Sequence, residues 1–176
     1  MNKIIKVIEY WIKDQAGVAA VEAALIFPIL LVMFIGVFDL GNGILANQKT
    51  IRASQVVVDL VTRSRVVNSG DIDEAINAGS LAYLPMSSEN FGVDIVSIRF
   101  DEDNVPEILW RETRNMTPED DVFDAVESLA EPGGGVVMVS ARYRFEPLFA
   151  GFVVDEIDMN ERAFGRGRRG AVVERE

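Results

Sequence analysis

One nearly uncharged stretch, Val18–Phe38, constrains the fold of this chain more than any other feature. Its only charged residue is Glu22, and no polar residue follows until Asp39. A helix in the core of a soluble domain would normally show a polar face. An α-helix needs about 20 apolar residues to cross the ~30 Å hydrocarbon core of a bilayer. The stretch is of that length and therefore predicts a transmembrane helix.

Glu22 is the only charged residue in this span, and its position in an apolar helix indicates a function. An ionised side chain costs about 2.5 to 3.5 kcal/mol at the centre of a membrane helix and less near its end, so such a residue suggests a function and a partner. The span contains no Lys or Arg. Cleavage after Gly17 would create an amino group on Val18 at nearly the same depth, on this subunit or on a neighbour. The alternative is an interfacial carboxyl group, hydrated or protonated, without a role.

Gly17 precedes the apolar run, and Glu22 is the fifth residue after it. This spacing is similar to the cleavage site of class III type IV prepilins and pseudopilins. The same region contains Ala19-Ala20-Val21-Glu22, Ala24-Leu25, Pro28-Ile29-Leu30-Leu31 and Gly36-Val37-Phe38-Asp39-Leu40-Gly41. This block, about 25 of the 176 residues, resembles the TadE-like family, the pseudopilin-type proteins of the tight-adherence (Flp) pilus machinery. Ala23 stands where many members carry Phe or Tyr.

The resemblance implies an α+β, pilin-like protein that is not an enzyme. It implies that a prepilin peptidase cleaves between Gly17 and Val18, and that Glu22 takes part in processing and subunit assembly. The protein would act in the assembly of a tight-adherence type IV pilus from the bacterial inner membrane. Its partners would be the prepilin peptidase, other pilins and pseudopilins, the pilus assembly platform and membrane lipid.

The charges around the span predict its orientation. Lys3, Lys6 and Lys13 precede the span, whereas Lys49 and Arg52 are the only nearby cations after it. The positive-inside rule therefore favours a cytoplasmic N-terminus and a periplasmic C-terminal domain. The leader also mixes charged and apolar residues in the manner of a short interfacial helix. The predicted organisation is a leader at 1–17, a transmembrane helix at 18–38, a helical stalk at 39–66 and an α+β domain at 67–176.

The composition excludes several classes of function. The chain has 28 acidic and 17 basic residues, a net charge of −11, and its first 38 residues hold three of each kind. The domain after the span is therefore acidic, and nucleic acid is not an expected partner. Cysteine and histidine are absent. This excludes disulfides, histidine-dependent triads, HExxH zinc sites and haem ligation by imidazole, and we expect no metal or cofactor.

Two other functions remain open at this point. The span could merely anchor a periplasmic hydrolase or binding protein, although the lack of His, Cys and any nucleophile motif disfavours a hydrolase. The chain could also be a single-pass periplasmic scaffold or sensor that is never processed and keeps residues 1–17.

The residues after the span predict the remaining elements. Pro28 removes a backbone donor, so we expect a kink in the span there. Apolar residues near helical spacing predict that the first helix continues to about Arg65 and packs on the domain. These residues are Leu40, Ile44, Ile51, Val58 and Val61. Further expected elements are a helix at Asp71–Leu84, strands at Phe91–Phe100 and Glu107–Arg114, a short helix from Thr117-Pro118-Glu119 to Ala130, and strands at Val136–Leu148 and Phe152–Arg166. Together they predict a long helix packed on a small antiparallel sheet.

Three charged segments have ordinary interpretations beside functional ones. Residues 101–104 lack the twelve-residue pattern of a Ca²⁺ loop and predict a hairpin turn. The acids within 119–127 predict a solvated face rather than paired catalytic carboxylates. The arginines within 162–169 predict a frayed, soluble terminus, or a contact with lipid headgroups or an acidic neighbouring subunit.

Overall fold

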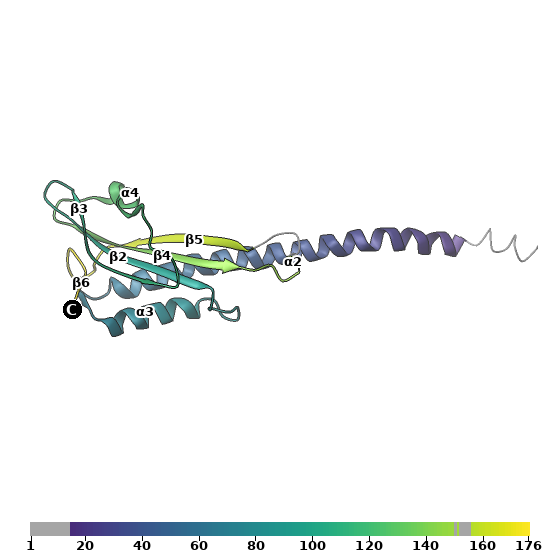
Figure 1. The fold of residues 1–176 in the computed structure, drawn as a ribbon, viewed down its shortest axis with the longest axis horizontal. Coiled ribbons are helices and arrows are strands. Elements are labelled where there is room, and N and C mark those ends of the chain that lie inside the picture. The colour runs from purple at the N-terminus through teal and green to yellow at the C-terminus, as the bar shows by residue number, and fades with distance from the viewer. Residues whose placement is uncertain (1–14, 150, 152–155) are drawn as a thin grey trace, which may run out of the picture.

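The computed structural model describes residues 15–149, 151 and 156–176. The predicted interfacial helix of the leader falls largely outside these residues. Figure 1 shows one long helix whose N-terminal half projects alone from a small α+β domain and whose C-terminal half lies along the sheet. The elements are α2 (Gln15–Val61), β1 (Val66–Val67), α3 (Ser69–Leu81), β2 (Phe91–Phe100), β3 (Pro106–Arg114), α4 (Val122–Val126), the 3₁₀ helix η1 (Glu127–Leu129), β4 (Gly135–Phe145), β5 (Ile157–Gly165) and β6 (Glu174–Arg175).

Helix α2 is continuous through Pro28. Within the described residues it is the one helix long and apolar enough to cross a membrane. Its second half packs on the sheet through small and β-branched residues at helical spacing, namely Ala46, Thr50, Ala53, Val57 and Val61. The sequence prediction placed Leu40 and Ile44 in this contact, and that was wrong, since both are more than half exposed. Alanine allows a helix to approach a sheet more closely than leucine does, so the small residues form the contact face.

The main sheet has four antiparallel strands in the order β3-β2-β4-β5. Alternate residues of the central strands point to opposite faces. On β2, Val93 and Ile95 join the core under α2 and α3, while Val96 and Phe100 join a second core that α4 and η1 cover. The long helix therefore covers one face of the sheet, which is the predicted pilin-like α+β arrangement.

Most element boundaries agree with the sequence prediction. Strand β2 is as predicted, and β3 and β4 each begin one residue earlier than expected. Strand β4 ends at Phe145 rather than Leu148, and α3 ends at Leu81 rather than Leu84. Helix α3 begins earlier because Asn68 and Asp71 form a reciprocal capping box, with N–O distances of 3.0 Å in both directions. Helix α2 ends at Val61 rather than near Arg65 because Val66–Val67 pairs with β6 as a strand. Part of the predicted last strand, residues 152–155, lies outside the described residues.

Two predictions about the second half of the chain were wrong. The short helix begins at Val122 rather than Thr117, because both backbone polar groups of Glu119 bond to side chains of the sheet. The C-terminal segment is folded, not frayed. Val173 is buried, and its carbonyl oxygen accepts hydrogen bonds from Ser97 Oγ at 2.7 Å and Trp110 Nε1 at 2.9 Å.

Candidate functional site

The N-terminal half of α2 carries all four residues that the sequence singled out. Gly17, Val18, Glu22 and Pro28 are all exposed on this helix. A Cβ atom on Gly17 would have no atom within 4 Å. No other residue that the structure describes forms an ion pair with Glu22. Cleavage after Gly17, the role of Glu22 and the kink at Pro28 stay predictions.

This half of α2 presents a continuous apolar surface. Leu25, Phe27 and Phe34 are 68 %, 64 % and 72 % exposed, and the residues between them are similarly uncovered. Soluble proteins seldom expose an apolar surface of this extent, and the helix is consistent with a single-pass membrane anchor. The surface reaches the point where α2 meets the folded domain.

Asp39 marks that junction. Its carboxylate is buried and accepts backbone hydrogen bonds from Leu148 at 3.1 Å and Phe149 at 3.0 Å. The Phe38 and Phe149 rings meet edge to face, with centroids 5.6 Å apart. The residue just after the predicted span therefore fixes the chain that follows β4. The sequence pattern included Asp39, but its partners, more than 100 residues away, could not be read from that pattern.

An apolar groove of about 670 Å³ lies beside this junction, between α2 and the adjoining ends of β4 and β5. Leu40 and Ile44, the two residues expected in the core, line it instead, together with Phe145 and Met159. The groove extends the apolar surface of α2 a short way onto the domain.

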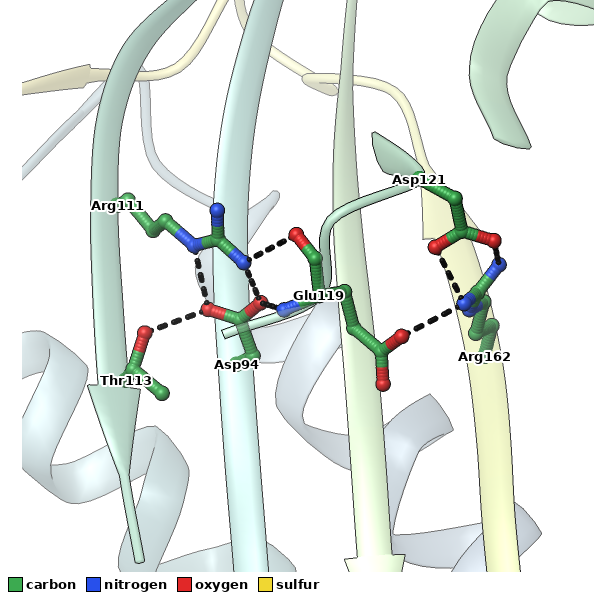
Figure 2. Close-up of polar contacts among 6 residues, drawn as sticks. All are labelled: Asp94, Arg111, Thr113, Glu119, Asp121 and Arg162. Atoms are coloured by element: carbon green, nitrogen blue, oxygen red, sulfur yellow. Dashed lines mark hydrogen bonds and ion pairs between the residues drawn. The ribbon is translucent and has the colours of Figure 1, made fainter. Parts of the chain in front are cut away.

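The outer face of the sheet holds the best connected polar cluster in the described domain (Figure 2). Asp94 of β2 is fully buried. Its carboxylate accepts hydrogen bonds from Arg111 Nε at 2.9 Å, Thr113 Oγ1 at 2.7 Å and the Glu119 backbone N–H at 3.1 Å, and also from Arg111 Nη2. Burial raises the pKa of Asp94, but these donors outweigh burial and hold the pKa below its usual range.

The same cluster extends to β5 through Arg162. Its guanidinium donates to Glu119 Oε2 at 2.8 Å and to both carboxylate oxygens of Asp121, at 2.7 and 2.9 Å. Figure 2 shows Glu119 between the Arg111 and Arg162 guanidinium groups. These hydrogen bonds and ion pairs hold the segment before α4 on the sheet. We assign it a structural role.

The other charged segments also bind within the chain. Glu119 and Asp121 were expected on a solvated face, but both bind Arg162. Arg166 pairs with Glu131, and Arg168 pairs with Asp59 of α2. Asp101 Oδ1 accepts from the backbone N–H groups of Asp103 and Val105, which forms the predicted hairpin turn. Across the described residues, acidic side chains nowhere gather in a group that could hold a metal ion.

Comparison with known proteins identifies the N-terminal helix. Residues 17–59 match the family described as TadE-like protein. The match covers nearly all of α2, including Glu22, Pro28 and Asp39. No curated protein and no solved structure matches the chain. The chain therefore carries a TadE-like family domain at residues 17–59.

Proposed function

We propose that this protein is a membrane-anchored, non-enzymatic pilin-type subunit that acts in the assembly of a tight-adherence type IV pilus. The observation that carries the proposal is the exposed apolar half of α2, which projects from a folded domain within the segment that matches the TadE-like family (Figure 1). An apolar helix that nothing in its own chain covers is suited to bind lipid first and other apolar helices later.

The proposed protein spans the inner membrane once, with a cytoplasmic N-terminus. Residues 18–38 are long enough to cross the hydrocarbon core. The lysines of residues 1–17 precede this span, and the acidic domain follows it. This distribution supports a periplasmic domain, because positively charged flanks are retained in the cytoplasm.

A prepilin peptidase removes residues 1–17 in this proposal. Gly17 is exposed at the start of α2, and the space beside it is open. Glycine weakens a helix and allows the backbone to approach a protease closely. Both properties support cleavage between Gly17 and Val18.

Cleavage would give Glu22 its partner. The new amino group of Val18 would lie about one helical turn from the Glu22 side chain, in the same subunit or across a stagger between neighbours. In the low dielectric of a bilayer, an unpaired charge is costly and a pair between subunits favours one axial offset. Glu22 therefore acts in association between subunits rather than in folding.

Substitution of Glu22 tests this role. Glu22→Gln and Glu22→Ala should insert and fold normally, yet co-purify less with other pilins and reduce piliation. Glu22→Asp keeps the charge and is the matched control, so it should retain more of both. Membrane fractionation and circular dichroism check insertion and folding. Neutral variants that assemble like the parent protein would remove Glu22 from the assembly mechanism.

A further inference from the structure

We propose that the start of the β4–β5 connection, at Leu148 and Phe149, is a second membrane contact that seats the domain on the lipid surface. The proposal rests on the membrane anchoring by α2 proposed above. It adds a lipid-binding segment that lies more than 100 residues after Asp39 in the sequence, and it assigns Asp39 the role of positioning this segment.

The first argument is depth. The proposed span ends at Phe38, and the backbone N–H groups of Leu148 and Phe149 lie 3.1 and 3.0 Å from the Asp39 carboxylate oxygens. The Phe149 ring contacts the Phe38 ring itself. The headgroup layer is about 5 to 8 Å thick on each side of the hydrocarbon core. Two residues held this close to the end of the span therefore lie within that layer.

The second argument is surface chemistry. Leu148 is 71 % exposed and Phe149 is 48 % exposed, although both are apolar. Leu40, one residue beyond Asp39, is 66 % exposed on the wall of the adjoining groove. Strand β4 ends at the side of the domain from which the N-terminal half of α2 projects (Figure 1). These exposed side chains therefore continue the apolar surface of α2 onto the domain. A lipid surface covers such a patch without a specific protein partner.

The third argument is the satisfaction of backbone polar groups. A peptide N–H at the inner edge of the headgroup layer, next to the hydrocarbon, needs an internal acceptor, because lipid tails offer none. Asp39 supplies that acceptor for the backbone N–H groups of Leu148 and Phe149. The carboxylate thus lets Leu148 and Phe149 approach lipid without leaving these two N–H groups unpaired.

The chain has no cysteine, so a single introduced cysteine can carry a unique fluorophore. The full chain would be reconstituted in phosphatidylcholine vesicles with an environment-sensitive NBD label at Leu148→Cys. Val105→Cys is the matched control, because Val105 is 57 % exposed in the β2–β3 turn at the far end of the sheet. Val32→Cys, on the exposed half of α2, reports whether the span itself is in lipid.

Nitroxide groups on the lipid chains would quench labels that touch the membrane. We expect shallow nitroxides to quench Leu148→Cys at least about twofold more than Val105→Cys, and deep nitroxides to quench Val32→Cys. Adding Asp39→Ala should lower the quenching at position 148 and leave it unchanged at position 32. If the label at 148 behaves like the label at 105 while the label at 32 is quenched, the second contact is overturned and the anchor stands. An unquenched label at 32 overturns both proposals.

Discussion

Asp94 shows how a single residue can organise the outer face of the sheet. Hydrogen bonds stabilise the ionised carboxylate more than burial destabilises it, so the pKa of Asp94 lies below its usual range. The donors come from β3 and from the segment before α4, so ionised Asp94 helps to hold that segment against the sheet. Figure 2 shows these donors converging on one carboxylate.

Asp94→Asn should therefore destabilise the domain. The change leaves Arg111 without its charge partner, and because Arg111 is partly exposed we expect a loss of about 2 to 3 kcal/mol, below the usual cost for a fully buried pair. Chemical unfolding of the full chain in detergent, followed by near-UV circular dichroism, measures it. Glu107→Gln is the control, since it breaks an exposed pair with Arg99 and should cost less than about 1 kcal/mol. If the two variants lost equal free energy of unfolding, the Asp94 cluster would stabilise the domain no more than an exposed ion pair does.

The contribution of Asp94 should also depend on pH. A carboxylate whose pKa is lowered in the folded state stabilises that state above its unfolded pKa of about 3.9, and the stabilisation is lost as pH falls through the folded pKa. The stability difference between the parent and Asp94→Asn should be constant from about pH 5 to pH 8 and shrink below about pH 4. Unfolding curves across this range measure it. A difference that grows in acid would contradict the assignment.

Tyr83 connects several elements on the inner face of the sheet, the face that α2 covers. Its hydroxyl donates to Thr50 Oγ1 of α2 at 3.1 Å, and its ring stacks on Tyr143 with centroids 4.5 Å apart. Burial raises the pKa of Tyr83 to about 12, so the phenol stays a neutral donor at a pH where an exposed tyrosine would already ionise. This side chain thereby links α2, the segment after α3, and β4.

At the level of elements, α2 and α3 pack closely because Gly79 faces Val57. A Cβ atom at position 79 would lie 2.6 Å from Val57 Cγ2, and Val57 is itself fully buried. Valine is stiff about its single side-chain torsion, so it cannot easily move aside. The two helices would have to separate to admit a methyl group.

Gly79→Ala should accordingly lower the free energy of unfolding by about 1 to 3 kcal/mol, even though alanine favours a helix. Gly41→Ala is the matched control, because a Cβ at position 41 has no atom within 4 Å. The control should be neutral or stabilising by up to about 1 kcal/mol. Thermal unfolding of both variants compares them, and a stabilised Gly79→Ala variant would mean that the helix contact is looser than the structure shows.

The elements that sequence reasoning found are those with a strong local signal. The apolar run of α2 and the alternation of β2 and β4 are readable within each segment. The start of α4 was missed because Asp94 and Arg111 bind Glu119 and override the helix signal at Thr117. Such long-range contacts leave no periodic trace in the sequence.

The candidate site was predicted less completely than the fold. Sequence reasoning named the exposed residues of α2 but not the partners of Asp39, which follow β4. Strand β1 was also missed, because two residues carry no alternation and pair only with the C-terminal β6. The predicted roles of Gly17, Val18 and Glu22 involve other molecules, so the structure of one chain does not test them.

At the level of the whole molecule, one helix connects two surfaces of opposite character. The N-terminal half of α2 is apolar and uncovered, whereas the domain built on its C-terminal half contains the excess of acidic residues. This division supports the proposal that α2 anchors the subunit in a membrane and that the domain folds outside the cytoplasm. Removal of the leader would distinguish such a subunit from a permanently anchored scaffold or sensor.

The N-terminus of the protein purified from membranes tests this account most directly. In cells with an active prepilin peptidase, N-terminal sequencing and intact mass should show a chain that begins at Val18. Gly17→Leu should retain Met1, because a large side chain keeps the backbone from the protease, whereas the control Gly36→Ala should be processed normally. Recovery of the parent chain with Met1 intact in such cells would contradict the proposed processing and favour the unprocessed scaffold or sensor.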